Sequence, residues 1–209
     1  MYSLATPEVW ALDLTNIDNR WRQMESMPIA EGLTHAGFAV VGSKMYLCGG
    51  YLGGHPGPHI PDCLVYDHSK TKNQWESSAD LPIGRAGGGL VYMSTHNALL
   101  YSGGAERPDT TSADAFDYTD TWMYYLSDPS TGWIRKQDIP FLSNHVSYAT
   151  GRDEEGLERH FFVGGQGGEE ILIQTTSGTH GARPGLNGSR SRSREGTLPR
   201  RHGLRAAAF

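Results

Sequence analysis

Apolar residues occur along this chain in short runs that are separated by glycine and small polar residues, without the three-to-four-residue spacing of a helix. The stretch from Thr34 to Trp75 is one complete unit of this pattern. It contains two apolar runs on either side of the Gly42-Ser43 turn, a Gly49-Gly50 pair, a loop and a third apolar run at 63–67. This arrangement predicts an antiparallel meander of four strands.

The same landmarks recur at fixed offsets before and after this unit. Three tryptophans each stand seven residues before a proline, and a Gly-Gly pair follows each proline after 21 to 24 residues. The landmarks are Trp21, Trp75 and Trp133, Pro28, Pro82 and Pro140, and the glycine pairs at 49–50, 103–104 and 164–165. Because independent landmarks recur together, the sequence indicates a true repeat with a period of 54 to 58 residues.

Glycine pairs after a strand, a Tyr-Asp strand end and a tryptophan at this period resemble the kelch repeat, over residues 8–168. The resemblance implies four-stranded blades of a β-propeller. We therefore expect residues 1–170 to be all-β, with about twelve antiparallel strands grouped as two, four, four and two. Such a partial or open propeller is expected to be a fragment or truncated product of a larger one. The alternative is self-association, in which partner copies cover the open strand edges.

Residues 171–209 differ in composition from the repeats. They are rich in glycine, serine and arginine, and we predict a disordered tail. The chain has 18 basic and 23 acidic residues, but this tail holds seven arginines and one glutamate. The repeats are therefore acidic, which argues against nucleic-acid binding by the folded part. An arginine-rich tail that binds nucleic acid, and a tail that arose from a shifted reading frame, remain alternatives.

The sequence shows neither the pattern of a membrane span nor that of an export signal. No apolar stretch approaches the roughly 18 residues of a membrane span. The N-terminus lacks the basic and then apolar pattern of a secretion signal, although Met1 falls within a repeat. The sequence predicts a soluble chain that is not bound to a membrane, and it leaves the compartment unknown.

A binding site is expected on the face where the first strand of each blade begins, because the long loops 51–62 and 105–120 lie there. Aligning the repeats predicts that His35, Arg85 and His145 ring the mouth of the central channel. These side chains would suit an anionic or hydroxyl-rich ligand. The alternative is that they hydrogen-bond to backbone carbonyls of neighbouring blades.

The long loops supply four further candidates for binding, which are His55, His59, Asp62 and Arg107. Histidine and aspartate can ligate metals. The three prolines among residues 55–62 instead favour a stiffened exposed loop, so we assign no metal and no cofactor.

Cys48 and Cys63 flank the first long loop. They are expected to end and to begin adjacent antiparallel strands, which would bring them within disulfide reach. A disulfide would favour an oxidising compartment. Two buried free thiols are the alternative.

The resemblance implies a non-catalytic binding module for a protein or carbohydrate partner on the long-loop face. An alternative is part of an enzyme similar to galactose oxidase, whose copper centre uses two tyrosines, two histidines and a cysteine cross-linked to one tyrosine. A kelch-type sugar isomerase is a further alternative. No stretch of this sequence matches either set of active-site residues, so we assign no catalytic residue and do not expect an enzyme.

Overall fold

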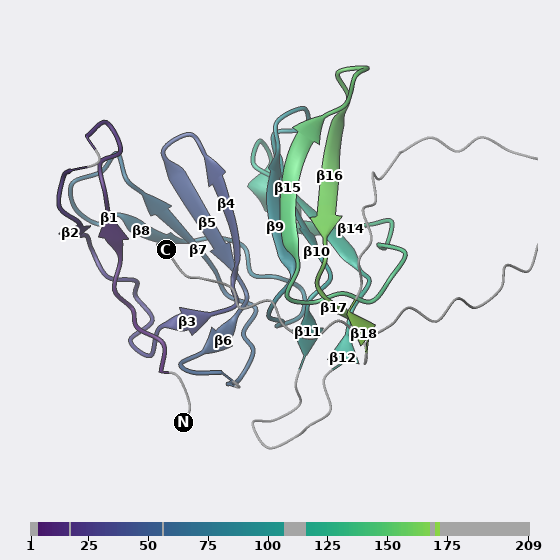
Figure 1. Cartoon of the computed structure of the whole chain (residues 1–209), viewed down its shortest axis with the longest axis horizontal. Helices are drawn as coiled ribbons and strands as arrows, with labels where there is room; N and C mark the ends of the chain where they lie inside the picture. The colour runs from purple at the N-terminus through teal and green to yellow at the C-terminus, as the bar shows by residue number, and fades with distance from the viewer. Residues whose placement is uncertain (1–3, 17, 56, 107–115, 168–169, 172–209) are drawn as a thin grey trace, which may run out of the picture. The chain divides into compact units, whose positions relative to one another are not determined.

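The structure is a computed structural model that describes residues 4–16, 18–55, 57–106, 116–167 and 170–171 (Figure 1). These residues all lie within one compact unit, which spans residues 1–179. They form an all-β fold with one short 3-10 turn, η1 (Pro129–Thr131). None of the described residues belongs to a helix with the length and hydropathy that crossing a membrane requires. Arg107 and the tail beyond Ile171 lie outside the described residues.

Two four-stranded antiparallel sheets, or blades, occupy the middle of the sequence, in the orders β4-β5-β7-β8 and β9-β10-β13-β14. Hairpins β1-β2 and β15-β16 precede and follow them in the chain. These strands are β1 (Trp10–Ala11), β2 (Arg22–Gln23), β4 (Gly37–Val41), β5 (Lys44–Cys48), β7 (Cys63–Asp67), β8 (Trp75–Ser77), β9 (Gly89–Met93), β10 (Ala98–Ser102), β13 (Thr121–Tyr125), β14 (Trp133–Lys136), β15 (Ser147–Arg152) and β16 (Glu158–Val163). Consecutive strands pair, so the predicted all-β grouping of two, four, four and two is confirmed.

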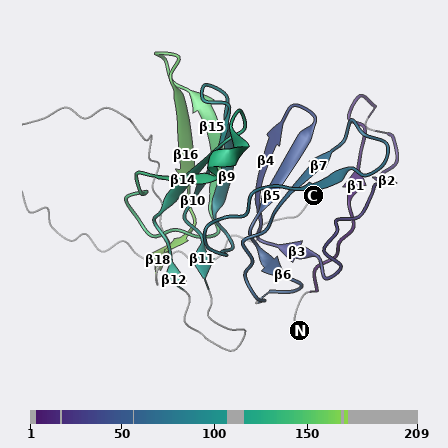
Figure 2. The ribbon, with the colours of Figure 1, turned by 180° about the vertical axis from the view of Figure 1, so that it is seen from behind.

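Short strands that the sequence pattern did not predict form three further two-stranded sheets, which are seen together at one end of the blades in Figures 1 and 2. They are β3 (Leu33–Thr34) with β6 (Tyr51–Leu52), β11 (Ala105–Glu106) with β12 (Phe116–Asp117), and β17 (Gln166–Gly167) with β18 (Glu170–Ile171). The predicted long loops therefore begin with paired backbone. Two-residue strands are too short to produce an alternating pattern that could be recognised in the sequence.

The Gly-Gly pairs join each blade to the next. The amide of Gly50 donates to the carbonyl of Arg85, and the amide of Gly104 donates to the carbonyl of Ser143, both over 2.8 Å. The first glycine of both pairs is also constrained, because a Cβ would lie 2.4 Å from the carbonyl oxygen of Arg85 on Gly49 and 2.7 Å from that of Ser143 on Gly103. Glycine is required here both for the left-handed backbone and for the close approach of two chains.

Tryptophan makes the second link between repeats. The indole Nε1 of Trp75 donates to the carbonyl of Glu25 over 3.0 Å, and that of Trp133 donates to the carbonyl of Ala79 over 2.8 Å. Both acceptors lie four residues after the tryptophan of the preceding repeat. Trp21 instead has 61% of its surface exposed, so the structure does not place it between blades.

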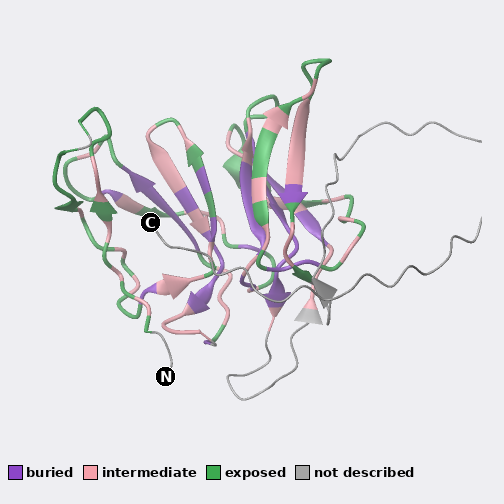
Figure 3. Ribbon diagram, viewed as in Figure 1, coloured by how far each residue is buried: buried purple, intermediate pink, exposed green. Residues whose placement is uncertain are grey.

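The core lies within and between the two central blades (Figure 3). Leu90, Leu99 and Tyr101 of one blade share a buried cluster with Ala39 and Val65 of the other. The inner strands approach closely, because a Cβ on Gly37 would lie 2.8 Å from Cβ of Leu90. This packing brings the ends of β4 and β9 together and so positions the site described below.

His160 in β16 couples the stability of the fold to pH. Burial lowers the pKa of its imidazole to about 4. Its Nε2 atom is buried without a hydrogen-bond partner among the described residues. An unfolded histidine titrates near pH 6.5, so between about pH 6.5 and 4 the unfolded chain binds a proton that the folded chain does not. The free energy of unfolding therefore decreases as the pH is lowered through this window, by at most about 3 kcal/mol.

We predict that a His160→Phe variant loses the part of this dependence that His160 contributes, and that it keeps the part due to His35, whose pKa is also below its ordinary value. Urea unfolding at a series of pH values between 7 and 5 measures it. Asp153 and Glu158 of the same hairpin have pKa values below their ordinary range, since hydrogen bonds outweigh the effect of burial. Their contribution is lost only at lower pH and does not obscure the window. Equal losses in the two proteins between pH 6.5 and 5 would contradict the assignment to His160.

Candidate functional site

Three histidines from distant parts of the sequence meet where the inner strands begin. His35 follows β3, His55 lies in the loop after β6, and His145 precedes β15. The imidazole centroid of His35 lies 4.7 Å from that of His55 and 4.8 Å from that of His145, and the last two are 6.2 Å apart. We call these three residues the histidine cluster.

Backbone pairing shows that two of the histidines hold the same position in different repeats. In each repeat, the residue after the Gly-Gly pair forms a bridge with a residue just before the inner strand. The bridges are Tyr51 with Thr34, Ala105 with Ala86, and Gln166 with Asn144. The residues that follow Thr34, Ala86 and Asn144 are His35, Gly87 and His145, which are therefore equivalent.

All three equivalent residues have a left-handed backbone, with φ of 58° at His35, 71° at Gly87 and 51° at His145. The amide of Gly87 donates to the carbonyl of His35, and the amide of His145 donates to the carbonyl of Gly87, each over 2.8 Å. The backbone of Gly87 thus lies between those of His35 and His145. Because Gly87 has no side chain, the imidazoles of these two histidines can contact each other. A left-handed backbone costs a residue other than glycine about 1–2 kcal/mol, and such residues concentrate at functional sites.

Arg85 does not join the cluster, because Gly87, two residues further along the chain, holds the position equivalent to His35 and His145. Its side chain is only 1% exposed, and its guanidinium binds both carboxylate oxygens of Asp120. It also lies 4.4 Å from the ring centroid of Tyr118. Burial alone would raise the pKa of Asp120, but the hydrogen bonds and charge of Arg85 hold it below its ordinary value. Arg85 is therefore half of a buried ion pair.

His59 and Asp62, two other loop residues predicted to bind, make their contacts outside the histidine cluster. Nε2 of His59 lies 3.5 Å from a carboxylate oxygen of Glu106. Glu106 also accepts a hydrogen bond from Tyr118, and burial followed by this bond raises the pKa of Tyr118 to about 12. The carbonyl of Asp62 accepts from the amide of Gly49. These contacts fix the shape of the loop.

A disulfide closes the base of the loop that carries His55. Cys48 at the end of β5 and Cys63 at the start of β7 are paired in register, with 4.2 Å between their Cα atoms. Both residues are buried, at 1% exposure. The two ends of the loop are thus held together, which limits the positions that His55 can reach.

Asn144 orients the imidazole of His145 through a hydrogen bond. Nδ2 of Asn144 donates to a carboxylate oxygen of Asp117, so the amide oxygen of Asn144 faces Nδ1 of His145 and accepts its proton. This chain of hydrogen bonds selects the tautomer in which Nε2 of His145 carries a lone pair. Desolvation, and then the proximity of His145 and His55, lower the pKa of His35 below its ordinary value. His35 therefore favours the neutral imidazole.

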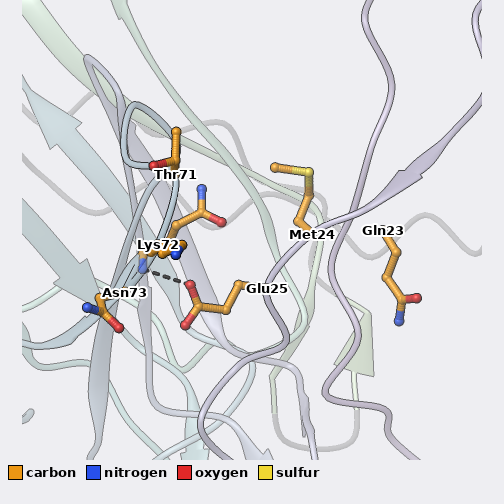
Figure 4. A pocket seen from close by; sticks show the side chains of 7 residues that line it. Gln23, Met24, Glu25, Thr71, Lys72 and Asn73 are labelled. Carbon is orange, nitrogen blue, oxygen red and sulfur yellow. Dashed lines mark hydrogen bonds between the residues drawn. The ribbon is translucent and has the colours of Figure 1, made fainter.

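A shallow pocket also lies at the opposite end of the strands (Figure 4). Residues 23–25 line one side of it and residues 71–74 line the other. The amide of Gln74 donates to the carboxylate of Glu25 across it, over 2.9 Å. The pocket includes no member of the histidine cluster, and its contacts join the first two repeats.

Sequence reasoning selected His35, His55 and His145 separately but did not predict that they meet. The missing signal was the equivalence of Gly87, which rests on backbone pairing with the residue after each Gly-Gly pair and not on a fixed spacing in the sequence. Asn144 and Asp117 were missed because their role depends on one side-chain contact, which has no sequence pattern.

Three comparisons with known proteins bear on identity. The family model of the Kelch motif matches residues 32–82. The tRNA wybutosine-synthesizing protein 4 of Candida albicans is 30% identical over 100 residues, which are 48% of this chain and 13% of that protein. The solved structure of YjhT, a kelch-type β-propeller, matches with a TM-score of 0.66 and 16% identity. The match covers 82% of this chain and 49% of the YjhT chain.

The chain thus spans less than two thirds of each of these proteins, and the likeness to YjhT concerns the fold alone. The match to the Kelch motif covers the complete unit from β3 to β8 and ends at the proline landmark, Pro82. Sequence motif and fold agree: residues 32–82 carry a Kelch motif, and the chain has four-stranded antiparallel blades of the β-propeller type.

Proposed function

We propose that this chain is a non-catalytic kelch-type binding module whose protein or carbohydrate partner binds where the inner strands begin. The observation that carries the proposal is the meeting of His35, His55 and His145, from two repeats and one loop, at that end of the strands. Imidazoles both donate and accept hydrogen bonds, and they suit hydroxyl, amide and anionic groups.

Two features favour binding over catalysis. The buried carboxylate of Asp120 accepts from Arg85 and Trp122, so it is not available as a general base. Cys48 and Cys63 are bonded to each other. Neither is therefore available for the cysteine–tyrosine cross-link of a galactose-oxidase-like copper centre, which disfavours that alternative.

A second candidate follows from the Candida albicans relative, whose name refers to tRNA wybutosine synthesis. This chain would then be a module of a tRNA-modifying protein and would contact RNA. The acidic balance of residues 1–170 is unfavourable for phosphate contacts, because seven of the 18 basic residues lie beyond them. We therefore place this candidate second.

Arrays of neutral and acidic glycans and peptides, with unfractionated tRNA as a third probe, test the proposal. We expect saturable binding to at least one glycan or peptide. A His35→Gly/His145→Gly variant should bind it at least about tenfold more weakly, a difference of about 1.4 kcal/mol. Glycine is chosen because the equivalent Gly87 has the same left-handed backbone.

The matched control is His96→Ala, since His96 is exposed in the β9–β10 turn at the opposite end of the blade. It should bind as the unaltered protein does. Binding that the double variant does not weaken would refute the site. Salt-sensitive binding to tRNA, without binding to glycans or peptides, would favour the second candidate.

A further inference from the structure

The histidine cluster has the composition and spacing of a transition-metal site. His35, His55 and His145 each offer one ring nitrogen, and these nitrogens all lie within 4.8 Å of one another. We propose that the three side chains together bind a single Zn²⁺ ion. The inference goes beyond partner binding and does not depend on it.

The choice of metal follows from the ligand atoms. Magnesium and calcium prefer oxygen ligands, whereas three imidazole nitrogens suit zinc and its neighbours in the first transition row. In a tetrahedral zinc site the Zn–N distance is about 2.0–2.1 Å, which places two ligand nitrogens about 3.4 Å apart. Two ligand nitrogens that are 4.8 Å apart must therefore approach each other by about 1.4 Å. His55 is suited to this movement, because Gly53 and Gly54 precede it.

The surroundings of His145 are those of a metal ligand. A histidine that binds a metal donates its other ring N–H to a carbonyl or carboxylate, which fixes the ring and its tautomer. Here Nδ1 of His145 donates to the amide oxygen of Asn144, and Asn144 in turn donates to Asp117. In this tautomer Nε2 is the ring nitrogen of His145 that can ligate a metal.

The backbone supports the same conclusion from an independent direction. His35 and His145 have the left-handed conformation that Gly87 adopts at the equivalent position. Glycine would be the unstrained choice at all three positions. Histidine at two of the three, with imidazole centroids 4.8 Å apart, indicates a role for these side chains beyond supporting the fold.

Three histidine ligands leave the fourth tetrahedral position open to water or to an atom of a partner. A carboxylate or carbonyl oxygen from a bound protein or carbohydrate could complete the coordination. Zinc would then act as a bridge between this chain and its partner. The structure assigns no hydrolytic chemistry to the ion.

Isothermal titration of the full chain with ZnCl₂, after chelator treatment, tests the proposal. We expect one equivalent of Zn²⁺ to bind. His35→Gly, His55→Ala and His145→Gly should each weaken binding at least tenfold, and Asn144→Ala should weaken it by about 10- to 100-fold through its effect on His145. Glycine at positions 35 and 145 retains the fold, which circular dichroism and urea unfolding of the same samples would verify.

The controls are His68→Ala and His96→Ala, which alter histidines at the opposite end of the blades, and a His180→Ala/His202→Ala variant of the tail. All should bind zinc unchanged. The absence of a one-to-one isotherm would overturn the proposal, as would unchanged affinity in folded His35→Gly, or loss of binding in any control. Partner binding that persists in chelator would separate failure of the zinc site from failure of the binding-module proposal.

Discussion

Replacing Arg85 by methionine is expected to lower the free energy of unfolding by about 3–5 kcal/mol. The side chains of Arg85 and Asp120 are only 1% and 7% exposed. Arg85 binds both oxygens of this carboxylate and also donates to the carbonyl of Gly103. Without the guanidinium, a buried negative charge would retain only the indole of Trp122 as its hydrogen-bond donor among the described contacts. Urea unfolding measures the loss.

Two further variants make this prediction specific. In Arg85→Met/Asp120→Asn the remaining amide is neutral and still accepts from Trp122, so much of the lost stability should return. Arg135 and Asp138 form an exposed pair at 2.9 Å, and Arg135→Met should cost less than about 1 kcal/mol. Similar losses from Arg85→Met and Arg135→Met would show that the buried pair is not structural.

The second large effect is expected from Gly49→Ala, which should lower the free energy of unfolding by about 2–5 kcal/mol. Part of this cost is the left-handed backbone at φ 69°. The rest is steric, because the new Cβ would lie 2.4 Å from the carbonyl oxygen of Arg85, and a backbone oxygen cannot move aside as a flexible side chain can. Urea unfolding again provides the measurement.

Gly164 offers a matched control for the steric part. It occupies the same position in its repeat and has φ 68°, but no described atom lies within 4 Å of its added Cβ. Gly164→Ala should therefore cost only the backbone term, about 1–2 kcal/mol. Equal losses in the two variants would mean that the Gly-Gly pair does not lock one blade to the next.

The blades were predictable because their landmarks have repeated physical roles. The Gly-Gly pairs at 49–50 and 103–104 permit a close approach to the next repeat, and Trp75 and Trp133 both donate to a carbonyl of the preceding repeat. Such requirements recur once per blade and leave a period in the sequence. The short pairs such as β3-β6 were not predictable, since two residues carry no period.

The histidine cluster was only partly predictable for a related reason. The segment between the proline and the inner strand varies in length, with seven residues from Pro28 to His35 and five from Pro82 to Gly87. The proline therefore does not mark the mouth position, which is identified only by the backbone bridge to the residue after each Gly-Gly pair. His55 reaches the cluster through the path of a loop, which depends on tertiary contacts with no local signal in the sequence.

The central claim is that three histidines, separated by 20 to 110 residues in the sequence, come together at one end of the blades. Nuclear Overhauser spectra of protein with labelled histidine side chains measure this directly. The structure predicts cross-peaks from the ring protons of His35 to those of both His55 and His145, whose centroids lie 4.7 and 4.8 Å away. Ring protons of His35 that show contacts only within their own repeat would contradict the account.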